Sequence, residues 1–162
     1  MKLKIRNFRY GFFYTMKIIQ ANIAQLQDLT PLFNAYRVFY NQESDLRLAE
    51  RFLSARIDNG ESIIFIAYDA NKAIGFTQLY PIFSSVSMET MLVLNDLYVV
   101  ANYRSKGVGK ALIDAAKAYC TKAHYKGLSL ETAKNNPAQH LYEREEFTKD
   151  DFLHYNWSNP KK

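Results

Sequence analysis

The chain has 162 residues, of which 48% are hydrophobic and 23% charged, as in an ordinary soluble globular domain that can bury a core of its own. A single cysteine, Cys120, excludes an intramolecular disulfide and favours a reducing, cytoplasmic compartment. The formal net charge is +5, but residues 1–15 hold four basic residues and no acid, so the remainder is nearly neutral. A basic arm on a neutral domain argues against nucleic-acid binding as the main function.

Residues 1–15 lack the sustained apolar core and the cleavage site of a signal peptide, and no run approaches the ~20 apolar residues of a membrane-spanning helix. Met16 opens a regular strand pattern, which leaves two interpretations of this leader: an ordered extension, or a segment upstream of the true start of translation. We expect residues 16–162 to form one domain. The three histidines are scattered and lack partners at metal-ligand spacing, so we predict no metal site.

The first part of this domain predicts a short strand and two helices. The strand is expected at 17–21, and Asn22 followed by Gln25 has the pattern of a capping box. Apolar residues at helical spacing then continue to residue 40, and Pro31 should kink or divide this helix. A second helix is expected at 45–57.

The middle of the chain predicts three consecutive strands, at 62–68, 73–80 and 90–100. Polar and turn-forming residues at 69–72 join the first two as a hairpin, and a loop at 81–89 precedes the third. The third strand is the most continuous apolar run of the chain.

The last part predicts a strongly amphipathic helix at 107–124, a strand at 128–133 and a helix at 136–146, which begins with an Asn-Pro pair. Residues 147–157 are expected to close the chain as one long strand or a hairpin. The order is β-α-α-β-β-β-α-β-α-β, which predicts a single α/β (α+β) domain.

The most informative segment is a strand, a polar turn with glycines and a helix, within residues 94–110. Such a turn points free backbone N–H groups and the positive end of the helix at one spot, which suits a phosphate group. Gly107 and Gly109 allow a close approach of the backbone to an anion. Positive side chains surround them at Arg104, Lys106 and Lys110.

Two other phosphate-binding motifs do not fit this turn. A Walker P-loop requires glycine where Arg104 stands and Ser or Thr where Ala111 stands, and a dinucleotide-binding fingerprint requires glycine in place of Leu112.

Residues 104–109 resemble the R/Q-x-x-G-x-G/A signature of the GNAT superfamily of N-acetyltransferases. Residues 135–142, with the sequence NNPAQHLY, are similar to the N-x-x-A-x-x-L/F-Y element of that family, and the resemblance extends from about residue 16 to residue 157. Within the superfamily, the strand at 96–99 and its spacing to Tyr142 most resemble the diamine, polyamine and thialysine acetyltransferase branch.

The resemblance implies a mixed, mostly antiparallel sheet whose fourth strand splays from its neighbour, and acetyl-coenzyme A as the acetyl donor without a metal. The backbone of Leu97 and Val99 would pair with the pantetheine arm, and the amides of 105–110 would hold the pyrophosphate. An N–H group near Tyr98 would polarise the thioester carbonyl. The residues that the resemblance assigns to the coenzyme are Leu97, Tyr98, Val99, Arg104, Ser105, Lys106, Gly107, Val108, Gly109, Lys110, Asn135, Ala138 and Tyr142.

The implied reaction is direct attack of a primary amine on the acetyl group in a ternary complex. Asp96, a carboxylate within an apolar strand, is the candidate base, although the branch often has a second acid where this chain has Asn95. The alternative for Asp96 is a structural hydrogen bond at a strand bulge. Tyr142 matches the tyrosine that protonates the leaving thiolate in the family; the alternative for it is core packing.

The acceptor is expected to be a small amine: a polyamine, a diamine or an amino-acid-like molecule. In this fold the first two helices and the loop before the fourth strand wall the acceptor site. Candidate residues there are Tyr36, Tyr40, Glu43, Phe83 and Asp96, with core packing or solvated surface charge as the alternatives.

Three other functions stay open at this point: a coenzyme-binding sensor without catalysis, a protein lysine or N-terminal acetyltransferase, and a nucleic-acid-binding module that uses the leader. We expect a homodimer, for which the aromatic residues of 147–157 could form an interface or else close the core.

Overall fold

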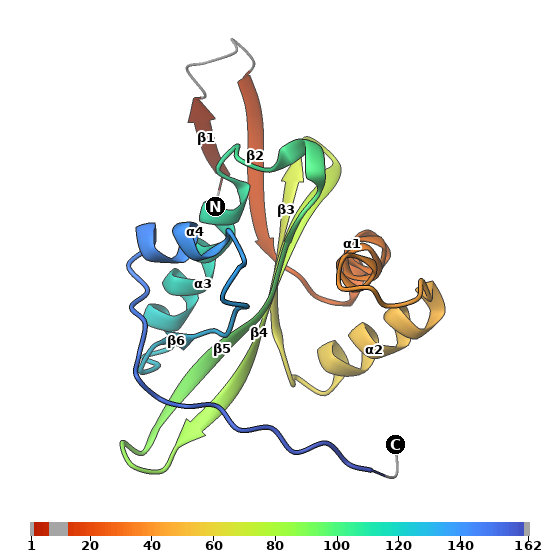
Figure 1. The fold of residues 1–162 in the computed structure, drawn as a ribbon. Helices are drawn as coiled ribbons and strands as arrows, with labels where there is room; N and C mark the ends of the chain where they lie inside the picture. Colours follow the sequence, from red (N-terminus) through yellow and green to blue (C-terminus); the bar gives the residue numbers. More distant parts are fainter. Residues whose placement is uncertain (1, 7–12, 161–162) are drawn as a thin grey trace. The chain divides into compact units, whose positions relative to one another are not determined.

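The computed structural model describes residues 2–6 and 13–160. In it, six strands form one sheet, and each strand lies beside the next one along the chain (Figure 1). All pairs are antiparallel except the last, which is parallel. The sheet is therefore mixed and mostly antiparallel, which confirms the predicted class. The strands are β1 (Lys2–Arg6), β2 (Phe13–Gln20), β3 (Ile63–Asp69), β4 (Lys72–Ser84), β5 (Glu89–Val99) and β6 (Leu128–Ser129).

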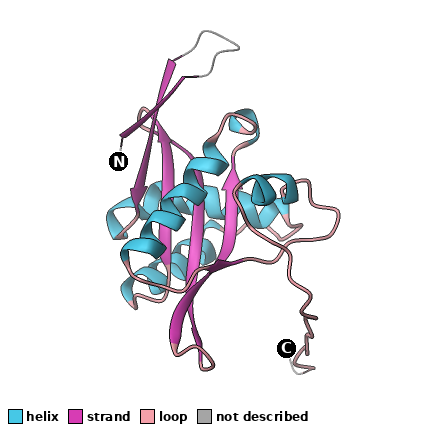
Figure 2. Ribbon diagram, turned by 90° about the vertical axis from the view of Figure 1, so that its left-hand side faces the viewer, coloured by secondary structure: helices cyan, strands magenta, loops and turns pink. Residues whose placement is uncertain are grey.

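Helices cover both faces of this sheet, within a first compact unit that spans Met1–Glu131. Figure 1 shows α1 and α2 on one face and α3 on the other, and Figure 2 views the sheet from the α3 side. The helices and short 3-10 turns of this unit are η1 (Ile23–Gln25), α1 (Leu26–Phe39), α2 (Leu46–Asp58), η2 (Ala101–Tyr103) and α3 (Val108–Lys122).

The α1–α2 face carries a hydrophobic core in which Leu29 and Leu53 from the helices meet Ile66 and Phe76 from the sheet. All four side chains are buried, and burial of each contributes roughly 1.5–3 kcal/mol. Because side chains alternate along a strand, Gln78 shares this face with Phe76, and Leu79 faces α3.

The predicted start of the first helix is confirmed. Asn22 Oδ1 accepts from the Ala24 amide at 2.8 Å, and Gln25 Oε1 accepts from the Asn22 amide at 3.1 Å. The helix is not divided at Pro31, however: α1 is one continuous helix that contains this proline. The cost is one backbone hydrogen bond, which the packed core around α1 outweighs.

The β4–β5 hairpin is longer than predicted. Residues 81–84 and 89 belong to strands instead of a loop, so only four residues form the turn. The sixth strand is shorter than predicted, because Leu128 and Ser129 alone pair with β5.

The second compact unit, Thr132–Lys162, contains one short helix, α4 (Gln139–Arg144). Asn136 Oδ1 accepts from the Ala138 amide at 3.0 Å, so the Asn-Pro pair makes a turn ahead of α4 instead of starting the helix itself.

The predicted closing strand is wrong: residues 147–160 contain no strand. Its large apolar residues Phe152, Leu153, Tyr155 and Trp157 are 77–89% exposed, so they do not close a core. A run of aromatic residues forms a strand only when a neighbouring strand provides backbone hydrogen-bond partners, and the sequence does not show whether such a neighbour exists. The homodimer expected from this run stays a prediction.

Within residues 2–6 and 13–160, no helix is long and apolar enough to cross a membrane.

Candidate active site

Strand β5 carries a bulge at Asn95, directly before the carboxylate that the sequence singles out. In the register with β4, Gln78 lies opposite Asp96, whereas the next residue, Leu79, lies opposite Leu94. Asn95 is therefore an extra residue with no partner position on β4, which defines a β-bulge. The strand bulge named in the alternative interpretation of Asp96 is thus present.

Beyond the bulge, β5 has a free edge. Its parallel pairing with β6 covers only Leu92 and Val93, and the described residues supply no strand partner on that side for Leu94–Val99. The Val100 amide donates to the Ile74 carbonyl at 3.0 Å, so in this antiparallel ladder the N–H and C=O groups of Leu97 and Val99 point away from β4. These are the groups predicted to pair with pantetheine, and they lie on the free edge.

The turn after β5 leads into α3 through Gly107, which has a left-handed φ of 84°. The first helical hydrogen bond runs from the Ala111 amide to the Gly107 carbonyl at 3.0 Å. The amides of Val108, Gly109 and Lys110 thus precede the first hydrogen-bonded turn and have no acceptor within the helix. Together with the positive end of the helix dipole, they form the anion-binding geometry that the motif predicts.

Arg104 does not present its side chain as a free phosphate ligand. Its Nε donates to the Val99 carbonyl at 2.9 Å. Its guanidinium carbon lies 5.3 Å from the Phe39 ring centroid and 5.8 Å from that of Tyr98. Arg104 therefore joins the C-terminal end of α1 to the end of β5, a role that the sequence did not predict.

The two lysines of the turn also have neighbours. Lys106 Nζ lies 5.4 Å above the Tyr103 ring, and Lys110 Nζ pairs with Asp114 at 3.0 Å on the helix surface. Ser105 adopts a positive φ of 58°, which turns the chain sharply before Gly107.

Asp96 is buried, with only 4% of its surface exposed. Burial raises the pKa of its carboxyl group, and hydrogen bonds from Tyr36 and Asn95 oppose part of that rise. The Asn95 amide donates to Oδ1 at 3.1 Å. Among the described residues the salt bridges include no cation paired with Asp96. A buried carboxylate held only by neutral donors is poised to accept a proton.

Two further polar residues of β4 lie on the same face. Gln78 is fully buried, and its amide Nε2 donates to the Tyr80 hydroxyl, whereas its Oε1 has no partner in the described part of the chain. Burial, followed by the negative charge of Asp96, raises the pKa of Tyr80 to about 12. Neither residue was predicted from the sequence; the available signal was a glutamine at an inward-facing position of an apolar strand.

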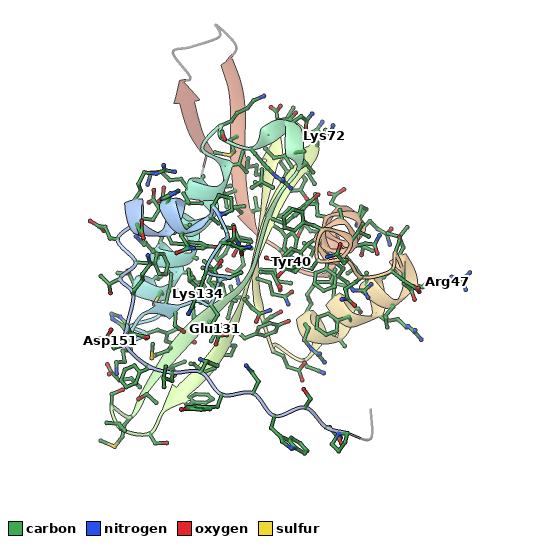
Figure 3. The ribbon with its side chains drawn as sticks, in the orientation of Figure 1. Tyr40, Arg47, Lys72, Glu131, Lys134 and Asp151 are labelled. Carbon is green, nitrogen blue, oxygen red and sulfur yellow. The ribbon has the colours of Figure 1, made fainter. Side chains whose placement is uncertain are left out.

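Two of the three aromatic side chains predicted at the acceptor site, Tyr36 and Tyr40, lie in the region of Asp96. The Tyr36 ring lies 5.0 Å from Tyr40, 5.9 Å from Phe76 and 6.3 Å from Tyr98, each in an edge-to-face arrangement. Tyr40, labelled in Figure 3, lies on the side of the sheet that carries α1 and is half exposed. Tyr36, Tyr40 and Asp96 thus belong to one region.

Two other candidates do not join this region. Phe83 is 80% exposed near the tip of the β4–β5 hairpin, and alternation along β4 places it on the face opposite Gln78. Glu43 lies in the loop between α1 and α2, where its backbone carbonyl accepts from Arg37 at 3.3 Å. Asp45, two residues later, caps α2 and accepts from the Leu48 amide at 2.9 Å.

The remaining candidates belong to the second unit. Asn135 lies in the turn before α4, and Ala138 is the N-cap of that helix. Tyr142 lies on α4, partly exposed, with its ring 6.0 Å from that of Phe147 in an edge-to-face contact.

Cys120 packs inside the first unit. It is 5% exposed, and burial raises the pKa of its thiol, which disfavours the nucleophilic thiolate. Within the described ranges, no three histidine, cysteine or acidic side chains come together in a way that could hold a metal ion.

The sequence model of the acetyltransferase (GNAT) family matches residues 26–147, which include the bulged strand, the glycine turn and α4. The chain belongs to the GNAT family. It is an N-acetyltransferase. A relative in Bacillus subtilis (strain 168) is named uncharacterized N-acetyltransferase YhfO. That relative is 48% identical over 149 residues, covering 91% of this chain and 100% of its own length.

Other GNAT relatives agree with this assignment. A probable acetyltransferase of Haemophilus influenzae is 34% identical over 79% of this chain and 97% of its own length. The crystal structure of a probable acetyltransferase has a TM-score of 0.83 and 35% identity, covering 88% of this chain and 97% of that one. An aminoglycoside acetyltransferase from a soil metagenome, with a TM-score of 0.77 over 89% of this chain and 96% of its own, is only 19% identical and shows the fold alone.

Membership of the GNAT family implies acetyl-coenzyme A as donor. The described geometry fits this molecule, since an unpaired strand edge at Leu97 and Val99 can accept an extended arm by strand addition. The left-handed Gly107 and the amides of the first turn of α3, at the positive end of the helix, suit its pyrophosphate.

Proposed function

We propose that the protein transfers the acetyl group of acetyl-coenzyme A to the primary amine of a small acceptor, by direct attack in a ternary complex. One observation carries this proposal: the bulge at Asn95 sets a free strand edge and a buried carboxylate side by side on β5. The free edge suits the donor, and Asp96 suits the removal of a proton from the acceptor.

The donor supplies an activated thioester, and the backbone of this chain positions it. Leu97 and the Val99 amide would pair with the pantetheine arm, while the Val99 carbonyl stays bonded to Arg104. The amides of 108–110 would hold the pyrophosphate. A backbone N–H group near Tyr98 or Val99 would polarise the thioester carbonyl as an oxyanion-hole donor.

Asp96 would take the proton that the acceptor must lose. An alkylammonium group has a pKa of ~10.4, so a free amine is scarce at neutral pH without a base. The raised pKa of the Asp96 carboxyl makes it a stronger base than an exposed aspartate while it remains ionised above that pKa. Tyr142 would donate its phenolic proton to the departing thiolate, and Asn135 and Ala138 would contact the coenzyme.

The aromatic rings favour a small acceptor. Tyr36 and Tyr40 can hold an ammonium group by cation–π attraction beside a single carboxylate. Relatives that share only the fold act on acceptors as different as an aminoglycoside and a ribosomal-protein alanine, according to their names, so the fold does not identify the acceptor.

The test is a thiol-release assay with acetyl-coenzyme A and a panel of amines: diamines, spermidine, lysine, monoamines and a lysine peptide. Wild-type protein should release coenzyme A thiol with a small amine. Tyr142→Phe should lower kcat by roughly 10²-fold, whereas Tyr155→Phe, in the exposed C-terminal segment, should leave it unchanged. Release with the peptide alone would favour a protein acetyltransferase. Tight coenzyme binding without release by any amine would overturn the proposal.

A further inference from the structure

The buried position of Asp96 poses a problem for proton removal. The carboxylate is 4% exposed, so an acceptor amine meets the groups around it before it meets the carboxylate itself. Three polar side chains neighbour Asp96: Tyr36 from α1, Tyr80 from β4 and Asn95 from β5. Each is a candidate to pass the proton inward.

We propose that the Tyr36 hydroxyl contacts the acceptor amine and relays its proton to Asp96. This inference rests on the proposed acetyltransferase function and names the group that touches the acceptor. Tyr36 donates a hydrogen bond to the Asp96 carboxylate, and it is only partly buried, so its hydroxyl is joined to the base and its ring reaches the acceptor region.

The relay balances its protons. The ammonium group gives a proton to the Tyr36 oxygen, while the phenolic proton of Tyr36 moves along the existing hydrogen bond to Asp96. The amine is then neutral, Tyr36 is again a neutral phenol, and Asp96 is a neutral carboxylic acid. After the product leaves, the proton returns to solvent through the same hydroxyl.

The other two neighbours suit the relay less well. Asn95 is exposed and donates to Asp96, but an amide has no proton that titrates near neutral pH, so it can orient the carboxylate without carrying a proton. Tyr80 already accepts a hydrogen bond from the Gln78 amide, and it interacts with Asp96 and with Arg56 through charge alone.

The position of Tyr36 is set by aromatic packing. Its ring makes edge contacts with Phe76 and Tyr98 on the two strands and with Tyr40 one turn later on α1. Tyr98 belongs to β5, whose opposite backbone edge would hold the donor. This packing fixes the hydroxyl near both the base and the place where the acetyl group would lie.

Among the side chains that the structure describes, the charged and titratable groups that act on Asp96 are Tyr36 on α1 and Tyr80 on β4. Through Tyr80 they include the ion pair of Arg56 on α2 with Glu61. A change in the pH profile on removal of one hydroxyl can therefore be assigned to the relay.

The experiment compares Tyr36→Phe with Tyr80→Phe and Tyr125→Phe, using the amine that wild-type protein acetylates best. Each variant keeps its ring and loses one hydroxyl, and Tyr125→Phe is the matched control because its ring packs against Tyr119 of α3, on the other face of the sheet from Tyr36. Tyr36→Phe should lower kcat by roughly 10²-fold at pH 7 with little change in KM for acetyl-coenzyme A, and the two controls should stay within about threefold.

The pH profile supplies the decisive readout. Without the relay the amine must lose its proton in solution, so kcat/KM of Tyr36→Phe should climb about tenfold per pH unit toward the pKa of the amine, ~10.4. Wild-type protein should instead level off at a lower pH. A flat ratio between the two profiles, or loss of activity in Tyr80→Phe alone, would overturn the relay. An inactive wild type would instead contradict the proposed function, so the two failures are distinguishable.

Discussion

Gly75 of β4 leaves no room for a side chain against β5, and its replacement by alanine tests how the donor edge is built. Gly75 lies opposite Val99 in the ladder. A Cβ atom at this position would lie 2.7 Å from the Tyr98 carbonyl oxygen, 3.3 Å from Val99 Cγ2 and 3.4 Å from Val108 Cγ1. The first of these is a backbone atom well inside van der Waals contact, so β5 has to move.

The expected cost follows from two opposing effects. Overpacking of a buried position costs about 1–3 kcal/mol, and the lower conformational entropy of unfolded alanine returns roughly 0.5–1 kcal/mol. Gly75→Ala should therefore lose about 1–2 kcal/mol of unfolding free energy, which corresponds to a fall of roughly 2–8 °C in Tm for a protein of this size. Because the shift displaces the strand edge at Val99, kcat/KM for acetyl-coenzyme A should fall by about tenfold, since a misplacement of ~1 Å can cost about 10²-fold.

The matched control is Gly127→Ala. A Cβ atom at Gly127 would meet no atom within 4 Å, and its φ is not in the left-handed region. This variant should be neutral or stabilised by up to about 1 kcal/mol. The measurements are Tm by thermal unfolding and kcat/KM for acetyl-coenzyme A by steady-state kinetics, for both variants. Equal Tm values for the two variants, with unchanged kinetics, would refute the argument that close approach at Gly75 shapes the donor edge.

Three further variants probe the turn and the base. Gly107→Ala places a side chain at φ 84°, so it should lose about 1–2 kcal/mol and bind acetyl-coenzyme A more weakly in a calorimetric titration; unchanged affinity would contradict the role of this turn. Arg104→Gln removes the hydrogen bond to Val99 and the cation–π contact with Phe39, so urea denaturation should show a fall of about 1–2 kcal/mol in the free energy of unfolding. An unchanged free energy of unfolding would show that these contacts do not stabilise the fold. Because burial raises the pKa of Asp96, the folded state holds this proton more tightly than the unfolded chain, and stability falls as pH rises from about 4 through the raised pKa. Asp96→Asn should therefore be more stable than wild type at pH 7 but not at pH 3, while its activity falls; equal stability of the two proteins at pH 7 would argue that the buried charge costs nothing.

Most elements of the fold were predictable because their signals are local. The capping box at Asn22, the apolar spacing of α1 and the glycine before α3 each specify a structure within a few residues. The failures concern long-range pairing. The length of β6 depends on how many of its residues pair with β5. A strand at 147–157 would need a partner strand, which the described residues do not provide.

The candidate site divides in the same way. The backbone parts, at the end of β5 and the start of α3, were predicted because a short motif and a positive φ belong to one segment. The side-chain parts were only partly predicted. Arg104 has a contact with Phe39, 65 residues earlier in the chain, which no local pattern contains. Gln78 and Tyr80 became visible as neighbours of Asp96 only through the register of β4 with β5.

The bulge explains why a single segment can serve both substrates. Leu94 and Asp96 are two residues apart, so in a regular strand both would point to the same face. The extra residue Asn95 instead leaves Leu94 opposite Leu79 on the α3 face and puts Asp96 opposite Gln78 on the α1–α2 face, beneath Tyr36. If Asn95 took a regular position in the ladder, the carboxylate would share the face of Leu94 toward α3, away from the Tyr36 hydroxyl that now bonds to it. The edge that would bind the donor begins at the same place, because the pairing of β5 with β6 ends at Val93. The irregularity at Asn95 thus lies where the base and the donor edge meet. Deletion of Asn95 would make Leu94 and Asp96 consecutive residues on opposite faces of a regular strand, so Asp96 should stay opposite Gln78 but lose the hydrogen bond from Asn95.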